Sequence, residues 1–506
     1  MSTTNVFDLF VIGGGINGCG IARDAAGRGL SVALAEKSDL ASGTSSGSTK
    51  LIHGGLRYLE HYEFSLVRKA LVEREVLWMM APHIVWPLRF ILPHHENLRP
   101  SWLIRLGLFL YDHLGGRKRL PPSRGVDLSK KGKGSPLQAS FTKGFEYSDC
   151  WVDDARLVVL NARDAADKSA KIMTYTQVVS IQRSDGIWLI TVRSPNGSKE
   201  TYKANVVVNA SGPWIDIVRG ECHEEKSAAK IRMVRGSHIV VPSLFDHAEC
   251  YIFQNADDRI VFAIPYEEDF TLIGTTDADF EGDPGTACIS EEEKMYLCDS
   301  INSYFKKQVA LDDIVWTYSA VRPLMDEGEG KAQTASRDYQ IDVEVGSDQT
   351  ALVNVYGGKI TTYRKLAEDV LSNVGKYLPN LGKPWTANSP LPGGDFPVES
   401  AHILLEKLSN DFAFLKESHA RRLIRQYGTY AWRILKASTT YDDLGVCFGS
   451  DLYESEVNYL IEFEWATSAE DILWRRTKLG LQLTSNQALS LDEYLGSKII
   501  PSKCHS

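Results

Sequence analysis

Apolar residues form two short runs near the start of the chain, and a helical pattern separates them. Phe7 to Ile12 has the pattern of a buried strand, and an alanine-rich stretch with helical spacing continues through Ala26. Leu30 to Ala35 is a second apolar run, and it ends at Glu36. The order strand, helix, strand predicts the first half of a parallel α/β unit.

The turn between the first strand and the helix reads GGGINGCG. Gly13, Gly15 and Gly18 match G-x-G-x-x-G, whose glycines permit a tight turn, close approach of the backbone to a pyrophosphate and packing of helix on strand. Glu36 follows Gly18 by eighteen residues, where a carboxylate can accept hydrogen bonds from a ribose. These features predict a dinucleotide site but do not distinguish NAD from FAD.

A second strand, glycine and helix unit occurs far along the chain. Thr350 to Tyr356 has a strand pattern, GGK follows it, and a helix pattern begins at Thr361. In FAD proteins a late glycine-rich helix start commonly faces the flavin, whose developing negative charge the helix dipole stabilises. This late unit favours FAD over NAD.

The remaining patterns predict two further parts. Alternating apolar and polar residues from Ser237 to Thr276 predict an antiparallel sheet, whereas VVVNASG at Val206 to Gly212 predicts a short buried parallel strand. Beyond Pro397, apolar residues recur at three- and four-residue spacing through His402 to Lys436 and through Glu454 to Leu483. That spacing predicts a helical C-terminal domain.

Composition narrows the class of protein. The chain has 506 residues and a net charge of −9, which argues against a nucleic-acid partner because neutralising phosphates requires a broad basic surface. Its eight cysteines show no metal-ligand spacing, so no metal site is predicted. We find neither a secretory signal nor a run of about 18 apolar residues that could span a bilayer. A cytoplasmic location is expected, with contact to a membrane surface left open.

Six longer motifs carry a resemblance to a known family. They are the stretch Thr44 to His83, FEYSDCWVDDARLV, GSHIVVP, YSAVRPL, YGGKITTYRKLAE, and DILWRRTKLGL at Asp471 to Leu481. In this order they closely resemble the flavin-dependent glycerol-3-phosphate dehydrogenases over essentially the whole chain. The resemblance implies FAD as cofactor and oxidation of sn-glycerol 3-phosphate to dihydroxyacetone phosphate, by hydride transfer from C2 to flavin N5. It also implies that electrons pass to a membrane quinone.

The implied fold is that of the glycine oxidase and D-amino-acid oxidase flavoproteins, an α/β class. It combines a Rossmann-like FAD-binding domain of the two-dinucleotide-binding type, an antiparallel-sheet cap domain and an all-α C-terminal domain. We predict the FAD-binding domain at 1–80, 145–215 and 316–388, the cap at 81–144 and 216–315, and the helical domain at 389–506.

Two sets of site residues follow from the motifs and the resemblance together. The predicted cofactor-binding residues are Gly13, Gly15, Asn17, Gly18, Glu36, Thr44, Ser45, Ser46, Gly54, Gly212, Gly357 and Gly358. The predicted substrate-binding residues are Arg57, His238, Arg322, Lys359 and Thr361, and all except Thr361 are also predicted to be catalytic.

The cationic residues suit a phosphate dianion and a developing alkoxide. His238 is our first choice for the base that takes the hydroxyl proton, with a pKa expected near neutrality, and Lys359 is the second. For Arg57 a structural alternative is a salt bridge to Glu60 or Glu63. The sequence does not assign the phosphate or the alkoxide to a particular one of these cations.

A local basic region raises the question of membrane contact. Asn97 to Lys133 holds nine Lys or Arg against two Asp, and within it SWLIRLGLFLYDHLGGRKRL is apolar and aromatic. This pattern predicts an interfacial segment, with Trp102 and Phe109 in the headgroup region and Arg117, Lys118 and Arg119 on anionic lipid. The protein would then lie on the cytoplasmic face of the inner membrane. The alternative is a core helix beside a solvated basic loop.

Several alternatives remain open. Oxygen could replace the quinone as acceptor, or the substrate could be an amine or amino acid, as in flavin oxidases of the same fold. A non-catalytic FAD-binding protein is a third class, disfavoured by the set of Arg57, His238, Arg322 and Lys359. A homodimer is an expectation from relatives alone.

Overall fold

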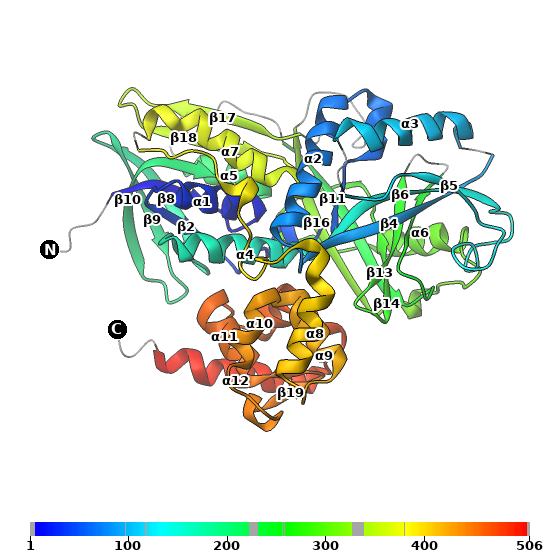
Figure 1. Ribbon diagram of the computed structural model, residues 1–506. Helices are drawn as coiled ribbons and strands as arrows, with labels where there is room; N and C mark the ends of the chain where they lie inside the picture. Colours follow the sequence, from blue (N-terminus) through cyan, green and yellow to red (C-terminus); the bar gives the residue numbers. More distant parts are fainter. Residues whose placement is uncertain are drawn as a thin grey trace.

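The computed structural model describes residues 6–96, 98–116, 119–221, 231–255, 257, 259–325, 338–378 and 380–502. These residues form two large sheets with helices packed on them, and a helical domain below (Figure 1).

The first sheet has eight strands, and five of them form its parallel centre. Its path runs β17 (Gln340–Val345), β18 (Ala351–Tyr356), β10 (Lys199–Asn209), β1 (Val6–Ile12), β2 (Val32–Ala35) and β7 (Lys171–Met173), with β8 (Gln177–Ser184) and β9 (Ile187–Arg193) joined to β10. The pairs among β18, β10, β1, β2 and β7 are parallel. Their nearly continuous apolar sequences suit strands that helices cover.

Three helices pack together in this part of the molecule. They are α1 (Ile16–Gly27), α4 (Asp154–Asp167) and α7 (Tyr363–Val374), and α1 contacts both of the others. Their apolar residues form one buried cluster with those of β1, β2, β10 and β18. The predicted Rossmann-like arrangement is confirmed, including the late strand and helix of β18 and α7.

The second sheet has ten strands and is antiparallel except where β12 meets β4. Its path runs β15 (Ala278–Asp279), β11 (Ile231–Pro242), β14 (Phe270–Gly274), β13 (Ile260–Tyr266), β12 (Cys250–Gln254), β4 (Val85–His94), β6 (Lys143–Val152) and β3 (Leu51–Ile52), with β16 (Trp316–Met325) on β11 and β5 (Arg124–Asp127) on β6. The antiparallel sheet predicted for Ser237 to Thr276 is therefore confirmed. The helices α2 (Phe64–Met80), α3 (Ser101–Leu114), α5 (Ile215–Gly220) and α6 (Glu291–Asn302) complete these two parts.

Sheet membership departs from the predicted domain ranges at β6 and β16. Both strands fall mostly or wholly in the ranges assigned to FAD binding, yet β6 pairs with β4 along ten residues and β16 pairs with β11 along ten residues. Strand partners so distant in sequence cannot be read from a local pattern. The division into domains stays a prediction.

The C-terminal part is helical and has its own buried apolar cluster. It contains α8 (Ala401–Asp411), α9 (Glu417–Tyr427), α10 (Ala431–Leu435), α11 (Glu454–Glu464), the π-helix η12 (Asp471–Arg476) and α12 (Ser485–Ser502). A small hairpin of β19 (Cys447–Gly449) and β20 (Leu452–Tyr453) is added to the predicted all-helical composition. This part lies against the side of the first sheet's layer where α4 runs (Figure 1).

Candidate active site

The glycine turn after β1 closes so tightly that side chains do not fit. Gly13 has a φ of +108°, and a Cβ there would lie 2.6 Å from the carbonyl oxygen of Ala210. A Cβ on Gly18 would lie 1.9 Å from the carbonyl oxygen of Gly13, so Gly18 lets α1 pack on the turn. The tight turn and the packing of helix on strand agree with the sequence prediction, and close approach of a ligand to this backbone stays a prediction.

Glu36 stands at the end of β2 beside this turn. Its carboxylate accepts hydrogen bonds from the backbone N–H groups of Gly14 at 2.6 Å and Ser38 at 2.8 Å. Burial raises the pKa of Glu36, and these two hydrogen bonds oppose that shift. Each carboxylate oxygen keeps a lone pair for a hydroxyl group.

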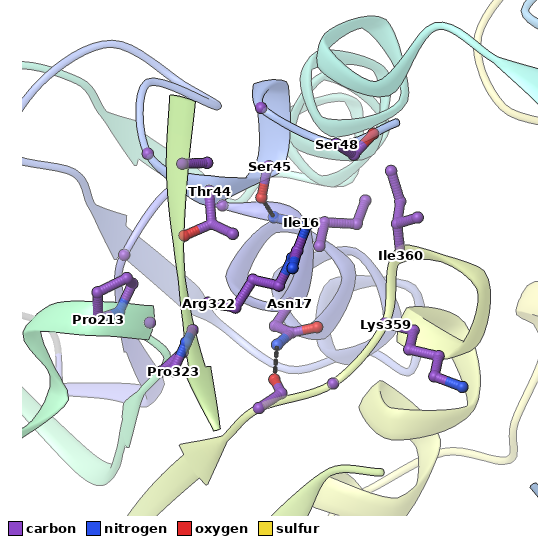
Figure 2. A pocket seen from close by; sticks show the side chains of 18 of the residues that line it. Ile16, Asn17, Thr44, Ser45, Ser48, Pro213, Arg322, Pro323, Lys359 and Ile360 are labelled. Carbon is purple, nitrogen blue, oxygen red and sulfur yellow. Dashed lines mark hydrogen bonds between the residues drawn. The ribbon is translucent and has the colours of Figure 1, made fainter. Parts of the chain in front are cut away.

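The turn opens into a cavity of about 760 Å³. Its wall is built from the β1–α1 turn, the segment after β2, the 3₁₀ helices η1 (Thr44–Ser46) and η2 (Leu56–His61), the end of β10, β16, and the segment before α7. Figure 2 shows Asn17, Thr44 and Arg322 gathered in this region from three separate elements, with the side chain of Lys359 extending away from them on the late glycine segment. Twelve of the predicted site residues line it: Gly13, Gly15, Asn17, Glu36, Thr44, Ser45, Arg57, Gly212, Arg322, Gly357, Gly358 and Lys359.

Hydrogen bonds hold the cofactor side of the cavity in shape. The hydroxyl of Ser45 accepts the backbone N–H of Ile16 at 2.9 Å, and the amide of Asn17 donates to the carbonyl of Gly357 at 3.1 Å (Figure 2). The second of these contacts joins the first glycine turn to the late one. The hydroxyl of Thr44 donates to the carbonyl of Val321 at 2.6 Å.

Five predicted site residues, all within the described chain, lie outside the cavity wall: Gly18, Ser46, Gly54, His238 and Thr361. The amide of Gly54 points instead at the hydroxyl of Tyr111, 2.8 Å away. The carbonyl of Ser46 accepts a hydrogen bond from the ammonium group of Lys50 at 3.1 Å. Thr361 is buried, and its hydroxyl accepts the backbone N–H of His53 at 3.3 Å. The position of these five residues within their motifs did not show whether each one faces the cavity.

His238 is buried beneath the wall rather than exposed to the cavity. Its Nε2 lies 3.0 Å from the hydroxyl of Thr49, which does line the cavity, and its ring stacks on Tyr318 with centroids 4.7 Å apart. Burial, with Arg322 and Lys50 nearby, lowers the pKa of His238 well below its usual value. The expectation of a pKa near neutrality, which followed from the predicted role as base, is therefore wrong, because the ring is buried near two cations.

The cations of the cavity have identifiable neighbours. Arg322 forms an ion pair with Asp277 and donates to the hydroxyl of Thr275 at 3.0 Å. The ammonium of Lys359 lies 3.5 Å from the ring centroid of Tyr58, a cation–π contact. Asp277, Thr275 and Tyr58 all line the cavity, and sequence reasoning missed each of them.

Arg57 is half-buried and lines the cavity. Across the described part of the chain it makes no ion pair with Glu60 or Glu63, and Glu60 pairs with Arg99 at 3.1 Å instead. The structural alternative considered for Arg57 is thus not realised here.

The opposite wall is apolar and comes from the ten-stranded sheet. Phe90, Tyr147, Ile252, Ile260 and Phe262 line it. Apart from Tyr147, which falls in FEYSDCWVDDARLV, they lie outside the motifs singled out in the sequence, and none of the five was predicted as a site residue. An apolar wall facing a few convergent polar groups is typical of a small-molecule site.

These features fit a bound FAD. The glycine turn and Glu36 suit the pyrophosphate and ribose, and the positive φ values of Gly212, Gly357 and Gly358 let the backbone approach a ring system closely. Among the described residues, the buried Oδ1 of Asn17 has no hydrogen-bond partner, which leaves an acceptor at this end of the cavity. Fold and site together define a flavin-dependent oxidoreductase.

Comparisons with known proteins agree. A sequence-family model described as FAD dependent oxidoreductase matches residues 8–358. A second family model, described as the C-terminal domain of alpha-glycerophosphate oxidase, matches residues 384–494. A glycerol-3-phosphate dehydrogenase from Pseudomonas aeruginosa is 52% identical over 97% of this chain and 96% of its own. A D-erythritol 1-phosphate dehydrogenase from Brucella abortus is 49% identical over 98% of both chains.

Among solved structures, the FAD complex of a glycerol-3-phosphate dehydrogenase from Bacillus halodurans superposes with a TM-score of 0.75. It is 26% identical, over 97% of this chain and 94% of that one. The chain belongs to the glycerol-3-phosphate dehydrogenase family of FAD-dependent oxidoreductases. FAD is its cofactor.

Proposed function

We propose that the protein oxidises sn-glycerol 3-phosphate to dihydroxyacetone phosphate. The observation that carries the proposal is the convergence of Arg57, Arg322 and Lys359 on the cavity that the glycine turn also lines. A phosphate monoester carries about −1.5 to −2 charge at neutral pH. A protein with a net charge of −9 needs such a local group of cations to hold that ester.

The chemistry divides between cofactor and protein. Bound FAD supplies an acceptor at N5 for the hydride that leaves C2 of the substrate. Arg322 and Lys359 are held in place before the substrate arrives, by Asp277 and by Tyr58, so their charge can stabilise the C2 oxygen as it becomes negative. Arg57 is assigned to the phosphate together with them.

The C2 hydroxyl proton needs an acceptor, and His238 remains our first assignment. Since its ring is buried, the proton would reach it through the hydroxyl of Thr49, 3.0 Å from Nε2. The low pKa keeps the imidazole neutral at neutral pH, with a lone pair on one ring nitrogen, but it also makes His238 a weaker base than a solvated histidine. Lys359 stays the second candidate.

The Brucella relative makes D-erythritol 1-phosphate a second candidate substrate, with the same phosphate on a longer polyol. Measuring kcat/KM for glycerol 3-phosphate, D-erythritol 1-phosphate and glycine with an artificial electron acceptor separates the possibilities. We expect glycerol 3-phosphate to be preferred and glycine to be inactive. A higher kcat/KM for the longer polyol would reassign the substrate, and turnover of glycine alone would contradict the phosphate assignment.

We further propose that the protein rests on the cytoplasmic face of a membrane and passes electrons to a quinone there. No helix within the described residues combines the length and apolar character needed to cross a bilayer. One helix does present apolar side chains to solvent: Trp102, Leu106 and Phe109 on α3 are 69%, 47% and 52% exposed. Tyr62 and Phe64, on the neighbouring turn and helix, are also exposed.

Many of the basic residues around α3 are paired with acidic residues, which weakens the predicted electrostatic contact with anionic lipid. Five of the basic residues between 97 and 133 are paired with acids: Arg99, Arg119, Arg124, Lys130 and Lys133. The partner of Arg119 is Glu399, so Arg119 faces the helical domain rather than lipid. Asn97, Arg117 and Lys118 lie outside the described residues. Apolar insertion is therefore the stronger support for membrane contact.

Flotation with anionic and neutral liposomes tests this proposal. We expect the protein to float with both, with weak dependence on salt, and the double variant W102E/F109E to stay behind. Replacing Ile403, an exposed apolar residue of α8, by Glu is the matched control and should leave flotation unchanged. Equal flotation of wild type and the double variant would remove α3 as the membrane contact.

A separate turnover assay tests the electron acceptor. Hydrogen peroxide formation without quinone reduction would favour oxygen as the acceptor.

A further inference from the structure

One buried cluster connects the helical C-terminal domain to the cofactor side of the molecule. Asp39, which is 1% exposed, follows Glu36 by three residues. Its carboxylate accepts hydrogen bonds from Arg475 Nε at 2.6 Å, from Arg476 Nη1 at 2.8 Å and from Arg476 Nη2 at 2.8 Å. Both arginines belong to the π-helix η12, within the motif DILWRRTKLGL that FAD chemistry does not otherwise use.

The segment that carries Asp39 wraps around the glycine turn. Glu36, Lys37 and Ser38 line the cavity before Asp39, and the stretch from Ser42 to Ser45 lines it afterwards. Between these two stretches the backbone N–H of Ala41 donates to the carbonyl of Gly14 at 3.1 Å. Leu40 packs closely on Gly14: a Cβ added to Gly14 would lie 2.9 Å from the Cδ2 atom of Leu40. The segment 36–45 thus forms one side of the cofactor cavity.

The arginines are themselves fixed from several directions. Arg475 Nη2 donates to Asp471 at 2.6 Å, and the hydroxyl of Tyr175, next to β7, donates to the same carboxylate oxygen at 2.7 Å. Arg476 Nη2 also donates to the carbonyl of Glu464, whose side chain forms an ion pair with Arg156 of α4. η12 is therefore held against the first sheet's layer at more than one point.

We propose that Arg475 and Arg476 are positioning residues through which the helical domain holds the segment 36–45 in the shape that binds FAD. A buried carboxylate without its cations carries a large desolvation cost, so undocking η12 would expel Asp39 and distort the segment on both sides of it. Docking of the helical domain and binding of FAD are then thermodynamically coupled, and each strengthens the other.

Variants of Arg476 test the coupling in the full-length holoenzyme. We expect R476M to release FAD faster and to bind it about 5- to 150-fold more weakly, the usual range for coupled sites, with excess FAD restoring the holoenzyme. R476K, which keeps the charge, should recover part of the affinity. The matched control is R422M, because Arg422 is paired with Asp451 and Glu456 inside the helical domain and does not touch the segment 36–45.

Flavin fluorescence measures the release, and hydrogen exchange locates the effect. Faster exchange at residues 36–45 in R476M but not in R422M supports the proposal. Unchanged FAD affinity in R476M, or an equal loss in R422M, overturns it. These readouts need no substrate, so failure here is distinguishable from failure of the proposed substrate.

Wild-type protein provides a second test that does not depend on a variant folding. Hydrogen exchange at residues 471–476 is compared between the holoenzyme and the same chain stripped of FAD. The coupling predicts slower exchange at η12 when FAD is bound. Equal exchange at η12 in the two forms would overturn the proposal.

Discussion

At the scale of single residues, the three cations that the sequence predicted for the cavity differ in their neighbours. Arg322 is paired with a carboxylate, Lys359 lies over an aromatic ring, and Arg57 makes no ion pair with Glu60 or Glu63, which both lie within the described residues. A guanidinium fork can bind Asp277 and still direct other N–H groups to a substrate oxygen. The charge at Arg322 is thereby fixed in place before a ligand arrives.

Arg322→Lys should separate charge from geometry. Lysine keeps the charge but loses the fork that reaches Asp277 and Thr275 together. We expect kcat/KM for glycerol 3-phosphate to fall about 10- to 150-fold, the equivalent of one charged hydrogen bond of about 1.5–3 kcal/mol. Arg232→Lys is the control, because Arg232 pairs with Asp279 on the same sheet away from the cavity. An unchanged kcat/KM in R322K would show that only the charge matters.

His238→Gln should depress turnover much more than flavin content. Because the pKa of His238 is well below its usual value, its protonation should produce no acid limb near pH 6.5 in the wild-type kcat/KM profile. A limb there that vanishes in the variant would contradict the structure. Full turnover in the variant would remove His238 as the base.

The same low pKa makes the stability contribution of His238 depend on pH. Unfolded histidine takes up a proton below about pH 6.5, whereas the folded, buried ring does not. Below that pH wild type should therefore lose stability relative to H238Q, by up to about 1.4 kcal/mol per pH unit, and above it the difference should be constant. Denaturant unfolding of both proteins measures the difference.

At the scale of elements, two glycine-rich turns and one strand build the site. The turn after β1 and the turn after β18 meet through the bond from Asn17 to Gly357, and β16 brings Arg322 against them from the other sheet. The parallel strands end at the edge where a dinucleotide binds in such folds, which explains why both turns face one cavity.

Gly13→Ala should reduce bound FAD. The added Cβ would meet the carbonyl of Ala210, and a φ of +108° strains any residue with a side chain by about 1–3 kcal/mol. Gly29→Ala is the control, since Gly29 also has a positive φ but open space around its Cβ position. We expect the ratio of flavin absorbance to protein to fall in G13A and to hold in G29A. Full flavin content in G13A would mean that the turn is not the cofactor site.

Elements with local signals were predictable from the sequence, and their partners were not. β1, α1 and β2 follow from apolar periodicity and glycines, and β11 to β14 follow from alternation. The pairing of β16 with β11 and of β6 with β4 depends on contacts between distant parts of the chain. For the same reason Asp277 and Tyr58 were missed, and His238 was expected to face the cavity although it lies one side chain behind Thr49.

At the scale of the whole molecule, the cavity lies where the two sheets meet. The parallel sheet contributes the turns that receive FAD, and the ten-stranded sheet contributes the apolar wall and Arg322. The helical domain contributes no lining residue in the described chain but contacts the segment after β2 through Asp39. The central claim is that a cofactor and a phosphorylated polyol share this one cavity.

Anaerobic addition of glycerol 3-phosphate to the purified yellow protein tests that claim most directly. Transfer of two electrons from the substrate should bleach the visible flavin absorbance in proportion to the substrate added, without any other reductant. Glycerol and inorganic phosphate added together are the control and should leave the spectrum unchanged. A flavin that stays oxidised in the presence of glycerol 3-phosphate would contradict the account.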